Sequence, residues 1–312
     1  MAAWTLIVNP IAGGGKAARL SPKLARLMDQ AGIDHAIFQT EGPGHAAELA
    51  RQAVDNGARR LLSVGGDGTA HEVAAGVLQR TLESGLEVGL ATLPAGTAGD
   101  WAKMFGLPRT PEALVPLLHQ PRFAIQDAGR MLHRTEAGET ARFFINVAGM
   151  GFDGFVVEQT RHQSKAGLRG QIFYLLGLVQ CVSRYKAQQV QVRAEGFEWE
   201  GRPTIINAGV CRYSGNGMQL VPRAIANDGL LDMTVVEDLG PLGILSNVYR
   251  LYNGSLYEHP KAHHRRTRWI EVSAAGGVAT ELDGEWIGYI NTRFETVPGG
   301  LRVLDAQASA PV

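Results

Sequence analysis

Over the first hundred residues, short apolar runs alternate with segments whose apolar residues recur at helical spacing. The apolar runs have the length of buried parallel strands and span residues 4–8, 36–40, 60–64 and 88–92. Two amphipathic segments between them end just before Gly32 and Gly57, where helix C′ residues belong. This β-α-β-α order predicts a doubly wound parallel sheet, whose ligand crevice lies beyond the carboxyl ends of the strands.

After residue 121 the pattern changes to strands separated by turns that contain Gly and Asn. Thr110 and Pro111 predict the start of a last short helix that ends near His119, and Pro121 marks the boundary. The later strands are expected at residues 142–147, 189–194, 204–211, 231–236, 268–272 and 278–282, and one helix, 168–184, interrupts them. The sequence therefore predicts an α/β domain over residues 1–121 and a β-sandwich domain over residues 122–312, with a C-terminal segment that can return to the first domain.

Charge and cysteine content exclude several classes of partner. The 312 residues include 30 Lys and Arg against 30 Asp and Glu, so no net field favours nucleic acid. Cys181 and Cys211 have neither metal-knuckle nor disulfide-framework spacing, which fits a reducing cytoplasm. No signal peptide is expected, and the longest apolar run, residues 172–182, is far shorter than the roughly 20 residues of a membrane span. We expect a cytoplasmic protein without a transmembrane segment.

Three strand-to-helix junctions of the first domain carry small, flexible residues. They read NPIAGGGKA at residues 9–17, GGDGTAHE at 65–72 and LPAGTAGD at 93–100. Glycines allow a ligand to approach the backbone, and the first-turn amides of the following helix attract anions. A single junction of this kind is weak evidence for ligand binding, because glycine-rich turns are common in α/β proteins. Three such junctions at one edge of a sheet predict a phosphate site. The first lacks the GxxxxGK[ST] and GxGxxG spacings, which excludes an ordinary P-loop or dinucleotide fingerprint.

The second junction has a structural and a chemical explanation. Thr69 and Glu72 have the spacing of a capping box, which accounts for them by helix stability alone. Asp67, between two glycines, can cap a turn. Beside bound phosphates it can instead orient a magnesium ion or accept a proton. The residues by themselves leave both explanations open.

Taken in order, these motifs resemble the diacylglycerol kinase catalytic-domain superfamily, which includes bacterial lipid kinases and sphingosine kinases. The resemblance also rests on FFINVAGMGFDGFVV, ANDGLLDMTVV and ELDGEWI farther along the chain. It implies a nucleotide-binding first domain, a β-sandwich second domain and ATP in the interdomain cleft. The implied activity is magnesium-dependent transfer of the γ-phosphate of ATP to a lipid hydroxyl at a membrane surface. Such an enzyme is cytoplasmic and peripherally membrane-associated.

The resemblance also implies roles for particular residues. Glu285 matches the usual proton acceptor, while Asp67 matches an essential acid that acts as the base in some members, and the sequence does not rank the two. Asp228, with the backbone carbonyls of Ile225 and Leu230, matches a magnesium site. Asp100 matches the retained acid of the third motif, on the substrate side. The residues assigned to the nucleotide and its phosphates are Asn9, Gly13, Gly14, Thr40, Gly66, Asp67, Gly68, Thr69, Glu72 and Thr97.

One position departs from the family. The third motif usually reads GTxND, but Gly99 stands in the Asn position, so an amide donor and acceptor is missing beside Asp100.

Turn formation also offers a purely structural explanation for the DG before Glu285 and for the NDG around Asp228.

The predicted function is an ATP- and magnesium-dependent lipid kinase, with diacylglycerol as the leading acceptor. Sphingoid bases, ceramides and monoacylglycerols stay open as acceptors. NAD kinase is an enzymatic alternative because it shares a GGDGT junction, and Gly99 motivates a non-catalytic nucleotide- or lipid-binding module. The segment at residues 172–182, flanked by Arg169, Arg184 and Lys186, is one candidate contact with a lipid surface, although such an amphipathic stretch more often packs in the core. The basic cluster at 263–268 is a second candidate, with a solvated strand edge as an equal explanation. No nucleic-acid partner is expected, and a homodimer stays open.

Overall fold

The computed structural model describes residues 3–135, 138–160 and 180–307, and the chain forms two compact units. The first unit holds residues 1–128 and 297–312, and the second holds residues 129–296. Two long strands, β5 (Phe123–Thr135) and β16 (Thr292–Leu304), have residues in both units. The first unit therefore extends to residue 128 rather than ending at residue 121, and it includes the C-terminal segment.

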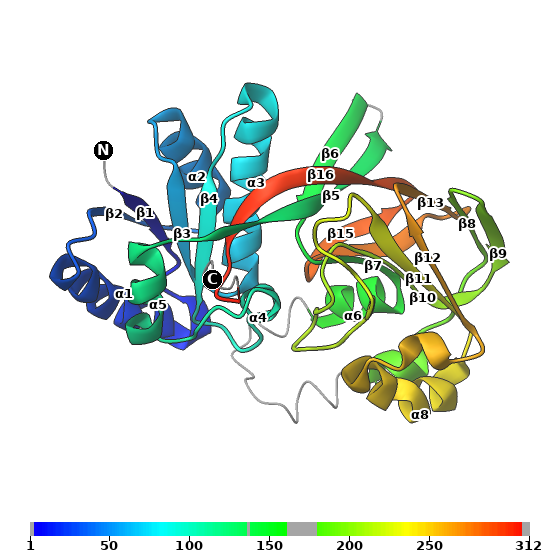
Figure 1. Cartoon of the computed structure of the whole chain (residues 1–312). Helices are drawn as coiled ribbons and strands as arrows, with labels where there is room; N and C mark the ends of the chain where they lie inside the picture. Colours follow the sequence, from blue (N-terminus) through cyan, green and yellow to red (C-terminus); the bar gives the residue numbers. More distant parts are fainter. Residues whose placement is uncertain (1–2, 136–137, 161–179, 308–312) are drawn as a thin grey trace. The chain divides into compact units, whose positions relative to one another are not determined.

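The first unit alternates strands and helices, as the sequence predicts. Its other elements are β1 (Trp4–Val8), α1 (Ala12–Gln30), β2 (His35–Gln39), α2 (His45–Asp55), β3 (Arg60–Gly65), α3 (Asp67–Ser84), β4 (Gly89–Pro94), α4 (Asp100–Met104) and α5 (Pro111–His119). The strands form a parallel sheet in the order β2-β1-β3-β4-β16 (Figure 1). Leu6 of β1 pairs with Ile37 on one side and Leu62 on the other. Gly32 and Gly57 have φ of 67° and 90° and follow their helices as predicted.

The second unit contains two antiparallel sheets, which confirms the predicted β-sandwich. Its elements are β6 (Gly138–Phe144), β7 (Val147–Gly151), α6 (Phe152–Thr160), β8 (Val190–Ala194), β9 (Phe197–Gly201), β10 (Pro203–Gly209), β11 (Leu231–Glu237), α8 (Gly240–Asn253), the 3-10 helix η2 (Leu256–Glu258), β12 (Ala262–Thr267), β13 (Trp269–Ser273), β14 (Val278–Leu282) and β15 (Glu285–Ile290). One sheet has the order β12-β11-β10-β7-β14-β15. In the other, β16 is followed by β13, β8 and β9, and β5 pairs with both β16 and β6.

The strand expected at residues 142–147 is divided into β6 and β7. The cause is Asp283, whose carboxylate accepts the N–H groups of Ile145, Asn146 and Val147 at 2.7, 2.9 and 3.0 Å. These amides are therefore bound by a side chain at the point where one strand would otherwise continue. The turn that contains Asp283 is thereby fixed to the loop between β6 and β7.

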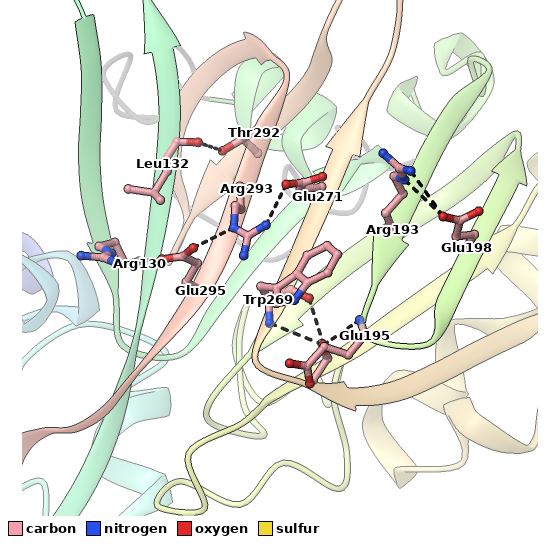
Figure 2. Close-up of polar contacts among 11 residues, drawn as sticks. Arg130, Leu132, Arg193, Glu195, Glu198, Trp269, Glu271, Thr292, Arg293 and Glu295 are labelled. Atoms are coloured by element: carbon pink, nitrogen blue, oxygen red, sulfur yellow. Dashed lines mark hydrogen bonds and ion pairs between the residues drawn. The ribbon is translucent and has the colours of Figure 1, made fainter.

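Charged side chains form a ladder across β5, β16 and β13 in the second unit (Figure 2). Glu295 accepts from Arg130 and from Arg293, each at 2.7 Å, and Arg293 also pairs with Glu271 at 2.7 Å. The Arg293 guanidinium lies 4.4 Å from the centre of the Trp269 ring. Paired charges of this kind keep a sheet face polar while they pin the register of neighbouring strands.

The helix predicted at residues 168–184 lies outside the described residues up to residue 179, and residues 180–184 are helical. None of the helices in the described ranges is long and apolar enough to cross a bilayer.

Candidate functional site

The carboxyl ends of β1, β3 and β4 bring the three glycine-rich junctions into contact. The Ala95 N–H donates to the Gly65 carbonyl at 2.6 Å. A Cβ atom on Gly13 would lie 2.1 Å from the Ala95 oxygen, and one on Gly96 would lie 3.0 Å from the Gly66 Cα. Glycine is required where these backbones approach so closely. We call residues 9–15, 65–69 and 95–100 the glycine edge.

The first junction is tied to the second by Asn9. Its N–H donates to the Val64 carbonyl at 3.0 Å, and its side-chain Nδ2 donates to Thr69 Oγ1 at 3.1 Å. Gly13 and Gly14 have φ of 59° and 66° and are exposed. The backbone turns left-handed here before the regular part of α1 begins, which leaves it open to a ligand.

The second junction presents the start of α3. This helix begins at Asp67, with Gly66 as an extended N-cap residue that makes no side-chain cap. The first-turn amides of Asp67, Gly68 and Thr69 therefore have no acceptor within the helix, and the helix dipole places positive potential there. Gly68 is exposed. This arrangement suits an anion such as phosphate.

The capping-box interpretation of Thr69 and Glu72 is wrong. The Glu72 carboxylate accepts the Gly44 N–H at 2.9 Å and the Ala46 N–H at 3.1 Å, which are donors at the start of α2. Glu72 caps the neighbouring helix because α2 and α3 pack against each other. The Glu72 carboxylate is therefore engaged at the start of α2, and its assignment to the nucleotide phosphates stays a prediction.

Asp67 joins the second junction to the third. Its Oδ2 accepts the Gly99 N–H at 2.8 Å. Gly99 has φ of 70°, and a Cβ atom there would lie 2.9 Å from Arg109 Nη1 and 3.1 Å from Pro94 Cβ. A side chain at position 99 would force Arg109 to move, so Gly99 and Arg109 depend on each other in this chain.

Arg109 is a residue of this edge that sequence reasoning missed. Its guanidinium donates to the carbonyls of Gly96, Thr97 and Ala98, at 2.5, 3.3 and 2.8 Å. Three consecutive carbonyls bound to one planar group hold the third junction in a single conformation. Arg109 belongs to no motif, and no pattern in the sequence could have indicated these contacts.

The remaining residues assigned to this unit lie around the glycine edge. Thr40 follows β2; its N–H donates to the Val8 carbonyl at 2.9 Å, and its side chain is buried. Thr97 is exposed within the third junction. Asp100 is the first residue of α4 and is only 4% exposed, so its carboxyl faces the interior of this unit.

Replacing Arg109 by Met should loosen the third junction without removing an apolar contact. We expect KM for ATP to rise about tenfold, which corresponds to about 1.4 kcal/mol and to the loss of hydrogen bonds from a charged donor. Steady-state kinetics at varied ATP measures this, and the exposed Arg26→Met on α1 is the matched control. An unchanged KM would mean that the junction keeps its shape without Arg109.

In the second unit, Glu285 begins β15 directly after a tight turn. Asp283 and Gly284 have φ of 48° and 86°, and Leu282 pairs with Glu285 across the turn. This confirms the predicted hairpin turn. Because the Asp283 carboxylate binds the loop between β6 and β7, Glu285 starts from a fixed backbone position.

A pair of acids lies beside this turn, one buried and one half-buried, and although each belongs to a motif quoted above, the sequence did not indicate that they meet. Glu281 is 3% exposed and accepts the Gly284 N–H at 2.5 Å, while Asp153 accepts Asn207 Nδ2 at 2.7 Å. A Cβ atom on Gly149 would lie 2.4 Å from Glu281 Oε1 and 3.3 Å from Asp153 Oδ2, so both carboxyls border one space. Burial raises the pKa of Asp153 to about 6. Burial and then the charge of Asp153 raise the pKa of Glu281 well above its usual value.

The residues assigned to magnesium lie in the loop before β11. Asp228 is paired with the Arg266 guanidinium from β12, and its Oδ1 accepts the Leu230 N–H at 3.0 Å. Ile225 is exposed. Among the described residues, no group of three or more His, Cys, Asp or Glu side chains is arranged to hold a metal. Because Arg266 already neutralises the one carboxylate, these residues do not fit a resident magnesium ion in this arrangement.

Two family models match consecutive parts of the chain. The diacylglycerol kinase catalytic domain matches residues 3–131, and the YegS C-terminal NAD kinase beta sandwich-like domain matches residues 146–305. A Pseudomonas fluorescens protein named "Probable lipid kinase YegS-like" is 33% identical over 273 residues, which cover 88% of this chain and 86% of that protein. A Cronobacter sakazakii protein of the same name is 31% identical over 297 residues, 95% of this chain and 94% of that protein.

Two solved structures are similar in fold. A diacylglycerol kinase from Bacillus anthracis str. Sterne has a TM-score of 0.70 and 19% identity, with 98% of each chain covered. Yeast NADH kinase in complex with NADH has a TM-score of 0.52 and 9% identity, with 98% of this chain and 84% of that chain covered. The yeast enzyme is therefore a distant neighbour, and at these identities both likenesses concern the fold alone.

Proposed function

Because the chain belongs to the family of YegS-like lipid kinases, which have the catalytic domain of diacylglycerol kinases, we propose that it phosphorylates diacylglycerol. The γ-phosphate of ATP passes to the acceptor's hydroxyl, giving phosphatidic acid and ADP. The observation that carries this proposal is the glycine edge, where three junctions in mutual contact offer backbone amides to one anionic ligand. Phosphoryl transfer depends on such a site because it consists chiefly of positioning the phosphates and stabilising their charge.

We assign the proton acceptor to Glu285 and a positioning role to Asp67. Asp67 already accepts the Gly99 N–H and thereby holds the third junction against the second. Glu285 starts a strand whose backbone is fixed by the neighbouring turn. In the proposed step, the acceptor hydroxyl gives its proton to Glu285 while its oxygen attacks the γ-phosphorus. The bond from that phosphorus to the β,γ-bridging oxygen breaks, and ADP leaves.

Magnesium enters this proposal as part of the substrate MgATP rather than as an ion held by residues 225–230. Arg266 supplies the positive charge at that loop, since it pairs with Asp228 and its Nε also lies 3.8 Å from Asp232 Oδ2. Asp232 is buried, and burial raises its pKa to about 6. The exposed Arg266 guanidinium therefore already supplies positive charge beside Asp228 and Asp232.

Replacing Arg266 by Met should convert this loop into one that responds to magnesium. We expect the wild-type thermal midpoint to be the same in Mg²⁺ and in EDTA. The variant loses about 1 kcal/mol, because the pair is partly exposed, and regains part of this loss in millimolar Mg²⁺. Thermal unfolding of both proteins measures the effect, with the exposed Arg142→Met on β6 as control. Stabilisation of the wild type by Mg²⁺ without nucleotide would contradict this assignment.

Radiolabelled ATP and a panel of acceptors test the proposed activity. The panel contains diacylglycerol, monoacylglycerol, ceramide and sphingosine in mixed micelles, and NAD in solution. We expect labelled phosphatidic acid. Label in the product of another lipid would identify that lipid, instead of diacylglycerol, as the acceptor, and label in NAD alone would favour an NAD kinase. Binding of ATP without turnover of any acceptor would favour a non-catalytic module.

The proposed enzyme works from the cytoplasm and binds the membrane surface peripherally, since diacylglycerol resides in a bilayer. The homodimer that the sequence leaves open stays a prediction.

A further inference from the structure

Helix α8 exposes an unusual number of large apolar side chains. Leu242 is 83% exposed, Leu245 43%, Tyr249 54% and Tyr252 51%, and no residue of this helix is buried. Their spacing of three, four and three residues places them on one side of the helix, within an arc of about 80° at 3.6 residues per turn. We call these four residues the α8 stripe.

The stripe belongs to a well-anchored helix. Ile244 and Leu251, which lie about 130° around the helix from the middle of the stripe, pack against the buried core cluster of the second unit. The helix ends at Gly254, which has the left-handed conformation of a C-cap, and Arg250 Nη1 donates to the Ser255 carbonyl at 3.1 Å. The apolar side chains of α8 therefore extend beyond the part of the helix that packs on the core, and the stripe is the exposed remainder.

The charge of α8 suits a lipid surface. The sequence GPLGILSNVYRLYN contains no acidic residue, and its one cation, Arg250, lies 5.3 Å from the Tyr249 ring centre. Tyrosine prefers the headgroup level of a bilayer, where its ring is apolar and its hydroxyl stays wet, and leucine prefers the acyl boundary. A helix of 14 residues is about 21 Å long, too short to cross a bilayer core of about 30 Å but suited to lie in its surface.

We propose that this protein binds to the surface of a bilayer through the α8 stripe. Leu242 and Leu245 then lie at the acyl boundary, and Tyr249 and Tyr252 lie among the headgroups. This inference rests on the proposed function, because a kinase whose acceptor stays in a membrane must reach that membrane. It names the surface that does so. Binding then depends on buried apolar area rather than on a basic patch.

The basic cluster at residues 263–268 is less suited to this role because several of its side chains have partners within the second unit. His263 pairs with Glu237 at 2.8 Å, and the His264 ring stacks on Tyr257. The Arg265 guanidinium lies over the Phe197 ring. These cations contribute to the packing around β12 and are not all available to headgroups.

A second copy of the chain is a less suitable binding partner for the stripe than a bilayer. At about 200 Å² for each large side chain, the exposed part of the four side chains totals about 450 Å². Two copies facing each other through the stripe would bury about 900 Å², less than the roughly 1,200 Å² at which specific interfaces begin. A bilayer has no such minimum, because it covers whatever apolar area is inserted.

Co-sedimentation with vesicles of phosphatidylcholine and phosphatidylglycerol tests the proposal. The variant Leu245→Ser/Tyr249→Ser removes half of the stripe, and Phe38→Ser/Leu82→Ser in the first unit removes an aromatic and a leucine of similar exposure, 46% and 48%. We expect the α8 variant to partition at least about tenfold more weakly than the wild type and the control variant to bind like the wild type. Equal binding by all three proteins, or no binding by the wild type, would overturn the proposal. Conversion of a dimer to a monomer in the α8 variant, with vesicle binding unchanged, would assign the stripe to a second copy.

A second measurement separates this surface from the activity. With short-chain diacylglycerol dispersed as monomers, the α8 variant should match the wild type, whereas on vesicles its turnover should fall with its binding. Equal loss of activity on both forms of substrate would show a general defect and overturn the assignment. Failure of the wild type to phosphorylate any lipid, together with stripe-dependent vesicle binding, would instead refute the proposed function and leave the surface in place.

Discussion

Replacing Glu285 by Gln lowers kcat for diacylglycerol phosphorylation by about 10²- to 10⁴-fold, the usual contribution of a general base. Gln has nearly the same shape as Glu but cannot accept a proton at neutral pH, so the turn and the start of β15 keep their geometry. KM for ATP should change little, since the nucleotide phosphates are assigned to the glycine edge in the other unit. Steady-state kinetics with mixed-micelle diacylglycerol measures both constants.

The comparison that makes this result specific is Asp67→Asn. If Asp67 is a positioning residue, its loss weakens the contact with the Gly99 N–H, so KM for ATP rises and the pH dependence of kcat stays as in the wild type. The exposed Glu198→Gln on β9 is the matched control for the loss of one carboxylate. Full activity in Glu285→Gln together with loss of the pH dependence in Asp67→Asn would transfer the role of the base to Asp67.

Replacing Asp153 by Asn makes the protein more stable than the wild type at neutral pH, by up to about 3 kcal/mol, a value scaled from a pKa raised from 3.8 to about 6. In the folded state, burial favours the neutral carboxyl, and Asn imitates that neutral form while it still accepts from Asn207 Nδ2. Glu281 no longer faces a charge at position 153, so its own ionisation costs less as well.

The sign of this effect follows from linkage. A carboxyl whose folded pKa is raised contributes stability that is fully present below the unfolded pKa of about 3.8 and is lost as the pH rises through about 6. The free energy of unfolding of the wild type should therefore fall, relative to that of Asp153→Asn, between pH 4 and pH 6–7. Urea unfolding at successive pH values gives this difference, with the exposed Asp34→Asn as control. Parallel curves for the wild type and the variant would show that Asp153 ionises normally in the folded protein.

The glycine edge could be predicted from the sequence because its signals are local. Each apolar run of the first unit has the length of a buried strand, and each of the three junctions carries its glycines where the strand ends. Parallel strands place their carboxyl ends at one edge, so the three junctions had to meet there. The close approach of Gly13 to Ala95 is the physical reason why the glycines occur.

The contacts of the charged side chains could not be predicted in the same way. Glu72 has the spacing of a capping box within its own helix, yet it caps α2, because the packing of two helices brings closer donors to it. Arg109 lies after the third junction in the sequence and belongs to no motif. Its contacts with three carbonyls form only because the folded junction brings those carbonyls to the guanidinium. The α8 stripe was also missed, because exposure depends on which face of a helix the core covers.

By itself, the sequence determined the alternation of strands and helices in the first unit, most strands of the second and the positions of the glycine junctions. These features follow from residue periodicity and backbone freedom, which act over a few neighbouring positions. Only the tertiary structure decided the partners of Glu72, Arg109, Asp228 and Asp283, and the meeting of Asp153 with the buried Glu281. Each of these contacts joins groups that become neighbours only when sheets and helices pack, and their energies depend on the burial that packing creates.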